Sequence, residues 1–233
     1  MTDFHSHILP GIDDGSKSLE MSLQMLRMEA AQGINMVVAT PHFYSTHESP
    51  EHFLQKRDHA EKILRQAMAE EPELPQLRVG AEVYYFRGIS QSEFLPLLTI
   101  QGTNCVLIEM PLVPWEKSMY RELEAIREKR DLIPIVAHMD RYLGIFRRFG
   151  IPKRLENLPV LVQANTSFFL NPVTARSAMK MLKKDQIQLI GSDCHNLTSR
   201  IPNMGDALRL VYQKMGREAL GKLSNYEDIL FDF

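Results

Sequence analysis

The spacing of short apolar runs along the chain is the feature that most constrains its fold. Seven such runs, most of them rich in Val, Ile and Leu, alternate with longer segments of helical periodicity. Short continuous apolar runs are typical of strands buried on both faces of a parallel sheet. The alternation therefore predicts an α/β fold, because parallel strands need crossover connections. The predicted strands are Thr2–Phe4, Asn35–Thr40, Arg78–Val83, Cys105–Ile108, Ile133–Ala137, Val160–Gln163 and Ile187–Ile190.

Several of the intervening segments carry clear helix signals. Leu19–Ala31 has leucines at helical spacing on one face, and Gly33 follows as a stop signal. Ser49-Pro50 combines a capping serine with a proline at the first helical position. Asn171-Pro172 has the same form and predicts another helix start, and 203–215 is a further candidate helix.

The number of strands and the length of the chain favour one domain. The chain has 233 residues, which suits a single larger α/β core better than two small ones. No boundary interrupts the alternation, so we expect one domain over residues 1–233 with a (β/α) barrel-like fold of about seven strands. An open doubly wound sheet is the alternative, but no G-x-G-x-x-G or Walker lysine motif supports nucleotide binding on such a sheet.

Composition narrows the class of protein. The net charge of −2 and pI near 6.5 lack the basic excess of a nucleic-acid-binding protein. Because the chain has only two cysteines, we do not expect a disulfide framework, and a reducing cytoplasm is the natural compartment. The N-terminus has no basic segment followed by an apolar run, and no stretch reaches about 18 consecutive apolar residues. We therefore expect a cytoplasmic protein without membrane insertion.

Polar side chains stand at or just after the ends of the predicted strands. In a parallel barrel these ends open on one face, where active sites are built. Five of the eight histidines and three carboxylates would meet there. Such a set is costly unless a cation holds it together, and divalent metals take imidazole and carboxylate as ligands. In strand order the residues are His5 and His7, His42, Glu82, Glu109, His138, Gln163 with Asn165, and Asp193 with His195.

The stretch GSDCHNLTSR allows two interpretations. Cys194 and Arg200 have the spacing of a cysteine nucleophile and a phosphate-binding arginine, whereas Asp193 and His195 form a D-x-H pair with metal-ligand spacing. A cysteine phosphatase loop normally needs glycine to expose its N–H groups to phosphate, and this loop has none. The two-residue period of an extended strand also points Cys194 away from its neighbours. The pattern favours metal ligands, with Cys194 in the packing.

Taken together, the motifs resemble those of the PHP (polymerase and histidinol phosphatase) metallohydrolases. The closest resemblance is to the bacterial manganese-dependent protein-tyrosine phosphatases of capsular and exopolysaccharide biosynthesis. It rests on H-S-H-I-L-P-G-I-D-D-G, T-P-H, G-A-E-V-Y-Y, I-E-M-P, A-H-M-D-R-Y, Q-A-N-T-S and S-D-C-H-N-L-T-S-R-I-P-N-M, from His5 to about Met204. The resemblance implies a distorted seven-stranded barrel of the PHP type that hydrolyses phosphotyrosine.

The same resemblance implies a set of metal ligands. Two to three divalent ions are implied, with manganese favoured and iron or zinc left open. For the third ion the family's D-G pair favours Asp14, which directly precedes Gly15, while Asp13 remains an alternative. The implied ligands are His5, His7, Glu82 and Asp193 for the first ion, Glu82, Glu109 and His138 for the second, and Asp14, His42 and His195 for the third.

The resemblance also implies phosphate-binding arginines and a mechanism. Arg141 and Arg200 follow His138 and His195 closely, and guanidinium forks suit phosphoryl oxygens. A metal-activated hydroxide would attack phosphorus directly. Either a metal-bound water or Asp140 could protonate the leaving phenolate. The implied partner is the phosphorylated tyrosine-rich tail of a bacterial polysaccharide-assembly kinase.

Two other functions remain open at this point. One is a small-molecule phosphatase of the same superfamily, for example one acting on histidinol phosphate. The other is a non-catalytic metal-binding scaffold, against which the complete ligand set argues. The sequence does not determine the oligomeric state.

Overall fold

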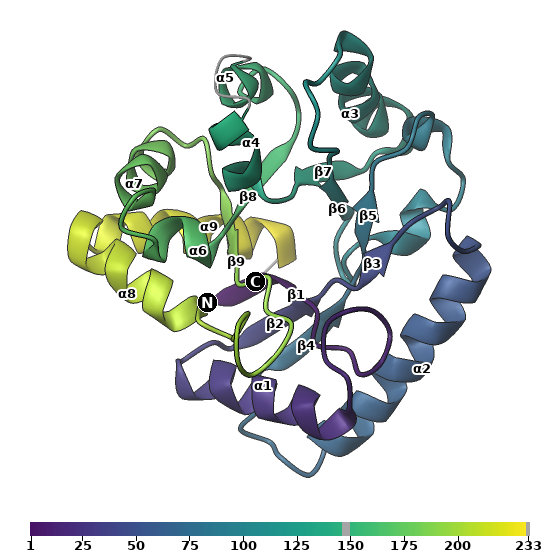
Figure 1. Ribbon diagram of the computed structural model, residues 1–233, viewed down its shortest axis with the longest axis vertical. Helices are drawn as coiled ribbons and strands as arrows, with labels where there is room; N and C mark the ends of the chain where they lie inside the picture. Colours follow the sequence, from purple (N-terminus) through teal and green to yellow (C-terminus); the bar gives the residue numbers. More distant parts are fainter. Residues whose placement is uncertain (146–149, 232–233) are drawn as a thin grey trace.

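A computed structural model describes residues 1–145 and 150–231 of the chain, which form one mixed α/β fold. Figure 1 shows helices arranged around the outside of a curled set of strands. Within the described residues, no helix is both long enough and apolar enough to cross a membrane. The strands are β1 (Thr2–Ser6), β2 (Met36–Ala39), β3 (His42–Phe43), β4 (Gln76–Val79), β5 (Glu82–Tyr84), β6 (Cys105–Glu109), β7 (Ile133–Val136), β8 (Leu161–Asn165) and β9 (Leu189–Gly191).

Every strand pairing among the described residues is parallel, as the sequence predicts. The strands form a three-stranded sheet, β1-β2-β4, and a six-stranded sheet, β3-β5-β6-β7-β8-β9. All seven predicted runs contain strand structure. The prediction of one strand over Arg78–Val83 is wrong, because the run is divided between β4 and β5.

The break between β4 and β5 has a local cause. A Cβ atom on Gly80 would lie 3.1 Å from Cγ1 of Ile100, which is tighter than most side-chain contacts, so glycine suits this close passage. The Gly80 N–H donates to the carbonyl of Ala39, and the chain then leaves β4 and pairs with β6 as β5. The short strand β3, which the sequence analysis did not predict, pairs with β5 directly across from Glu82. This break therefore brings His42 and Glu82 together.

The sheet curls until β9 approaches β1. The Asp193 N–H donates to the His5 carbonyl at 2.8 Å, and the His7 N–H donates to the Cys194 carbonyl at 2.9 Å. An isolated parallel bridge joins Ser6 and Cys194. Because this contact is a bridge and not a full ladder, the pairing defines a curled parallel sheet. Closure into a seven-stranded barrel stays a prediction.

The predicted helix boundaries agree with the structure at most of the tested positions. The helix predicted over Leu19–Ala31 is confirmed, and the Ser49 side chain caps the next helix by accepting from the His52 N–H at 3.2 Å. The helices are α1 (Leu19–Ala31), α2 (Pro50–Met68), α3 (Lys117–Arg130), α4 (Met139–Ile145), α5 (Ile151–Leu155), α6 (Thr166–Leu170), α7 (Ala175–Lys183), α8 (Met204–Met215) and α9 (Arg217–Phe231), with 3₁₀ turns at Ile89–Gln91 and Leu95–Leu98.

The predicted helix start at Asn171-Pro172 is wrong. Asn171 instead ends α6, and α7 begins at Ala175. The Asn171 side chain accepts a hydrogen bond from the Val173 N–H at 2.9 Å, which forms a local turn between the two helices. Asparagine followed by proline fits such a turn as well as it fits a helix start.

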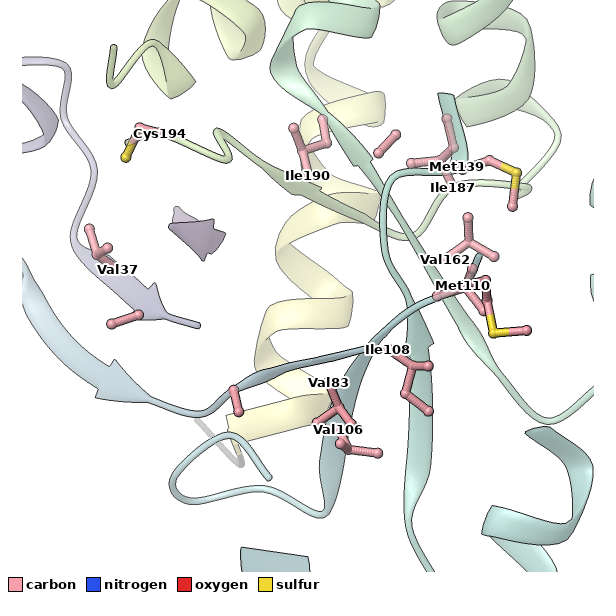
Figure 2. Close-up of a cluster of buried hydrophobic side chains, with 14 of the residues drawn as sticks. Val37, Val83, Val106, Ile108, Met110, Met139, Val162, Ile187, Ile190 and Cys194 are labelled. Atoms are coloured by element: carbon pink, nitrogen blue, oxygen red, sulfur yellow. The ribbon is translucent and has the colours of Figure 1, made fainter. Parts of the chain in front are cut away.

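Two apolar clusters hold the fold together. The larger lies between the sheet and the helices, and Figure 2 shows part of it, including Val83 of β5, Ile108 of β6 and Val162 of β8. Burying each such side chain contributes about 1.5–3 kcal/mol. In the smaller cluster, Phe4 and Leu107 meet apolar side chains from β2, β7 and β9, so this cluster fills the inside of the curl. Tyr226, Leu230 and Phe231 of α9 pack against it.

Candidate metal centre

Histidines and carboxylates gather at the carboxyl ends of the strands. All nine residues predicted as metal ligands belong to groups in which one ligand atom from each member lies within 4.8 Å of the others. Neutral imidazole and carboxylate are the ligand types that divalent metals take. The groups are His5–His7–Asp193, His5–Glu82–His138, His42–Glu82–Glu109 and His7–Asp14–His42–His195.

The groups differ in detail from the grouping that the resemblance implies. His7 is shared between Asp193 on one side and Asp14 on the other. Glu109 lies with His42 and Glu82, and no group contains it together with His138. The nine side chains therefore form a continuous cluster with shared members, and the assignment of each ligand to one ion stays a prediction.

Glu82 lies at the centre of this cluster. One oxygen, Oε1, lies 2.5 Å from Nε2 of His138. The other, Oε2, lies 2.9 Å from Nδ1 of His42 and 3.3 Å from Nε2 of both His5 and His7. β5 supplies Glu82 from the point where the chain breaks away from β4, and its side chain is fully buried. Four imidazoles thus surround one carboxylate away from water.

Backbone strain fixes two of these side chains. His138 and Asp193 both have positive φ, at 53° and 55°, an uncommon conformation for residues other than glycine. Such strain persists where surrounding structure holds it, and it clusters at functional sites. Close packing adds to the constraint, since a Cβ on Gly191 would lie 2.4 Å from Cβ of His5. The uncommon backbone conformation of these two residues directs their side chains into the cluster.

The charges in the cluster depend on one another. Burial alone would raise the pKa of Glu82, but the charges of His5 and His138 hold it well below its usual value. Burial would likewise raise the pKa of Asp193, but the charge of His5 helps to hold it well below its usual value. Burial lowers the pKa of His195 to about 4, with further lowering by His7, so this imidazole is neutral at pH 7. Glu82 and Asp193 are therefore ionised and the His195 imidazole is neutral, as metal ligands must be. Neighbouring carboxylates raise the pKa of His7 and His138 against the effect of burial, so a metal would displace a proton from these rings.

Three buried atoms in the cluster lack a normal hydrogen bond within the part of the chain that the structure describes. They are Oε2 of Glu82, Oδ1 of Asp193 and Nε2 of His195. Their neighbours are other charged or ionisable groups: Nη2 of Arg200 lies 2.5 Å from Asp193 Oδ1, Nδ1 of His42 lies 2.9 Å from Glu82 Oε2, and Asp14 Oδ1 lies 3.4 Å from Nε2 of His195. A divalent ion would complete the bonding of such atoms. All three belong to residues of the groups described above. The donor set and its unsatisfied atoms therefore fit bound divalent cations.

The two candidates Asp13 and Asp14 occupy different positions. Asp14 Oδ1 lies 3.4 Å from Nε2 of both His42 and His195, so Asp14 faces the cluster. Asp13 lies behind it, with Oδ2 2.7 Å from Nδ1 of His7, and it accepts from the His42 N–H at 3.1 Å. Burial opposes ionisation of Asp13, but the hydrogen bond with His7 lowers its pKa below its usual value. Asp14 is thus placed as a ligand candidate, and Asp13 as a residue that orients His7.

Gln163 and Asn165 of β8 also support the histidines from behind. Gln163 Oε1 accepts from the His138 N–H at 3.0 Å and lies 3.3 Å from Nδ1 of His5. Asn165 Oδ1 lies 3.0 Å from Nδ1 of His138, and its amide donates to Asp193 at 2.9 Å. Partners of this kind fix the ring orientation of ligating histidines. Sequence reasoning noted both residues at a strand end but assigned them no role.

Both predicted arginines reach the open side of the cluster. Arg141 donates to Glu109 at 2.7 Å and to Asp193 at 3.1 Å, and Nη2 of Arg200 lies 2.5 Å from Asp193 Oδ1. Their side chains are 32% and 39% exposed, whereas the Asp193 side chain is 5% exposed. The guanidinium groups therefore stand between the buried carboxylates and solvent, where an incoming anion would meet them.

The loop from Cys194 to Arg200 cannot serve as a cysteine phosphate cradle. Asn196 Oδ1 accepts from the N–H groups of Thr198, Ser199 and Arg200. The Arg200 carbonyl accepts from the N–H groups of His195 and Asn196. These donors are used within the loop, so they cannot bind phosphate. Cys194 is fully buried, and burial raises the pKa of its thiol well above the usual value.

The fold and the cluster define the class of the protein. It is an α/β protein with a candidate metal centre at the carboxyl ends of a curled parallel sheet, bordered by two arginines. A family model described as capsular polysaccharide synthesis, CpsB/CapC, matches residues 1–230. The chain therefore belongs to the CpsB/CapC family.

Individual relatives agree with this assignment. The tyrosine-protein phosphatase CpsB of Streptococcus agalactiae is 28% identical over 242 residues, covering 99% of this chain and 98% of the relative. The tyrosine-protein phosphatase YwqE of Bacillus subtilis is 26% identical over 238 residues, covering 99% and 91%.

A solved structure shares the fold. It comes from work on YwqE of Bacillus subtilis and CpsB of Streptococcus pneumoniae, described there as unique metal-dependent tyrosine phosphatases. Its TM-score is 0.86 at 22% identity, over 100% of this chain and 94% of that one. The resemblance inferred from the sequence motifs is confirmed.

Proposed function

We propose that this protein is a metal-dependent protein-tyrosine phosphatase. In this proposal residues 1–233 act as one PHP-type metallophosphatase domain, and the curled sheet is that of a distorted seven-stranded barrel. The observation that carries the proposal is the cluster of nine histidines and carboxylates with two arginines on its open side. Family membership and the names of the relatives support the same reaction.

The nine clustered residues would hold two to three divalent ions, with manganese favoured and iron or zinc as alternatives. When bound, such ions supply Lewis acidity to phosphoryl oxygens and lower the pKa of a water to about 7. The protein holds the ligands ready for this task. Glu82 and Asp193 stay ionised, and Asp13 with Asn165 fixes the rings of His7 and His138.

Arg141 and Arg200 would bind the phosphate. Each guanidinium already contacts carboxylates at the edge of the cluster, so each can reach a phosphoryl oxygen beside them. Their fixed positive charge would stabilise the charge that develops during displacement at phosphorus.

The leaving phenolate needs little assistance, because the pKa of a phenol is about 10. Asp140 is an unattractive proton donor for this step. It is about half-buried, and its carboxylate accepts from the Asn165 N–H at 3.0 Å, so it is engaged with the backbone of β8. Burial raises its pKa above the usual value, which suits a structural carboxyl group as well as an acid. Water at the open side of the cluster would then supply the proton.

The proposed substrate is a phosphotyrosine protein, in particular the tail of a bacterial tyrosine autokinase of polysaccharide assembly, in the cytoplasm. The family description, capsular polysaccharide synthesis, supports this partner. A net charge of −2 gives no support to a nucleic-acid substrate.

Metal analysis combined with phosphate release tests the proposal. Wild-type protein loaded with manganese should release phosphate from a phosphotyrosine peptide much faster than from histidinol phosphate. The His5→Ala variant should lose both bound metal and turnover, whereas His59→Ala, which removes an exposed histidine of α2, should lose neither. Faster turnover of histidinol phosphate would establish a small-molecule phosphatase. Peptide binding without phosphate release would establish a scaffold.

A further inference from the structure

A group of aromatic rings stands beside the metal-ligand cluster. Tyr44 follows β3, and its ring centroid lies 5.4 Å from that of His42 and 5.4 Å from that of Tyr84 at the end of β5. The His47 ring lies 5.0 Å from Tyr44 on a further side. These separations are those of interacting aromatic pairs. The rings therefore form a continuous surface that starts at a predicted metal ligand.

This surface belongs to the open side of the cluster. Tyr84 is directly opposite Glu109 in the pairing of β5 with β6. Tyr44 extends from His42, whose side chain is 18% exposed and whose Nδ1 contacts Glu82. Both tyrosines are partly exposed. A phosphoryl group bound among His42, Glu82 and Glu109 would therefore leave its ester oxygen within reach of these rings.

The core does not explain the two tyrosines. Tyr85 and Phe86, which follow Tyr84, pack against the larger apolar cluster, but Tyr44 and Tyr84 belong to neither apolar cluster. Within the described part of the chain, the hydroxyl groups of Tyr44 and Tyr84 form no hydrogen bond that would account for their positions. Two partly exposed tyrosines that neither fill the core nor satisfy a polar partner are available to contact a molecule that enters the site.

We propose that Tyr44 and Tyr84 form an aromatic wall that receives the phenyl ring of phosphotyrosine. This inference rests on the proposed phosphatase function and names the residues that determine its substrate class. The ring of the substrate would stack on the wall while its phosphate lies among the ligands and arginines. Phosphoserine carries no ring, so it would gain nothing from the wall.

Substitution of Tyr44 tests the wall with two peptides of identical sequence, one carrying phosphotyrosine and one phosphoserine. Tyr44→Leu should raise KM for the phosphotyrosine peptide roughly three- to tenfold, the loss of one aromatic pair, and leave the phosphoserine peptide within about twofold. Tyr44→Phe keeps the ring and should behave as wild type. Tyr84→Leu should act in the same direction as Tyr44→Leu.

Tyr85→Leu is the matched control, since Tyr85 has the same side chain in the same segment but packs against the core. It should leave the ratio of the two kcat/KM values unchanged. Bound metal is measured in every variant. An equal loss on both peptides, or a loss of metal in Tyr44→Leu, would overturn the wall while leaving the phosphatase function intact. Wild-type protein that binds metal but releases no phosphate from phosphotyrosine would refute the proposed function, and the wall with it.

Discussion

Two buried acidic clusters lie close together in this protein and behave in opposite ways. One is the metal-ligand cluster. The other, here called the rear cluster, consists of Asp3, Glu29 and Cys194, whose ligand atoms also lie within 4.8 Å of one another. The two clusters share chain segments, because Asp3 is two residues before His5 and Cys194 lies between Asp193 and His195. Position in the fold therefore does not explain the difference.

The two clusters differ in whether histidines lie next to the carboxyl groups. Histidines hold the pKa values of Glu82 and Asp193 well below normal against the effect of burial. In the rear cluster burial dominates, and together with the negative charge of Asp3 it raises the pKa of Glu29 to about 10. Neither carboxyl oxygen of Glu29 has a hydrogen bond within the described residues. Closely spaced acids become a cation site when imidazoles keep them ionised, and otherwise they retain protons.

Asp193→Asn should have the largest effect. The substitution removes the charge that faces His5, His7 and both arginines, so bound metal and turnover should fall together. We expect a loss of roughly 1,000-fold or more in kcat/KM, because metal ions supply several kcal/mol of transition-state stabilisation. Metal content and phosphate release measure the two effects separately.

The adjacent residue provides the control for this variant. Cys194→Ser changes a buried side chain of the rear cluster and should keep both metal and turnover. A Cys194→Ser protein that retains its metal but is inactive would show that the cysteine takes part in catalysis. It would also contradict the contrast between the two clusters.

Removal of a phosphate-binding arginine should have the next largest effect. Arg200→Ala removes the guanidinium next to Asp193 Oδ1 and should lower kcat about 100- to 1,000-fold, the usual effect of losing one charge-stabilising donor. Bound metal should change little. Arg209→Ala is the control, since Arg209 is exposed and pairs with Asp206 on α8. Full activity in Arg200→Ala would mean that its pairing with Asp193 is purely structural.

Asp13→Asn should have an intermediate effect on metal binding. Asp13 accepts from the His7 ring, and such supporting carboxylates contribute about 10- to 100-fold to metal affinity. Titration of metal into metal-free protein measures the change, and excess metal should restore much of the turnover. Asp14→Asn should be less readily rescued, since Asp14 is placed with the ligands. The reverse order would exchange the roles of the two aspartates.

The sequence predicts the ligand cluster better than it predicts what surrounds it. Strand-end histidines and carboxylates are visible because a parallel sheet brings the ends of its strands together wherever the turns lie. Gly80 divides a run that looks continuous, because its close approach to Ile100 appears only in three dimensions. The carboxylate behind His7 could not be identified from D-D-G alone, since both aspartates can reach the turn. The sequence also does not reveal the rear cluster, because Glu29 lies on a helix and approaches Asp3 and Cys194 only in the folded chain.

Glu29→Gln should have the smallest effect on turnover and a clear effect on the pH dependence of stability. The pKa of Glu29 is about 10 in the folded chain, against an ordinary value of 4.5. Between these values the folded chain binds a proton that the unfolded chain has lost, so this group lowers stability progressively as pH rises. Glutamine has nearly the same shape as the protonated acid and cannot ionise.

The variant should therefore become more stable relative to wild type as pH rises from about 5 to 9, by on the order of 1–3 kcal/mol. Chemical denaturation of metal-free protein across this range measures the difference. Glu20→Gln, on the exposed side of the same helix, should show no such trend. A difference between Glu29→Gln and wild type that does not vary with pH would mean that Glu29 is ionised in the folded chain. The rear cluster would then hold charge as the ligand cluster does, and the distinction between the two would disappear.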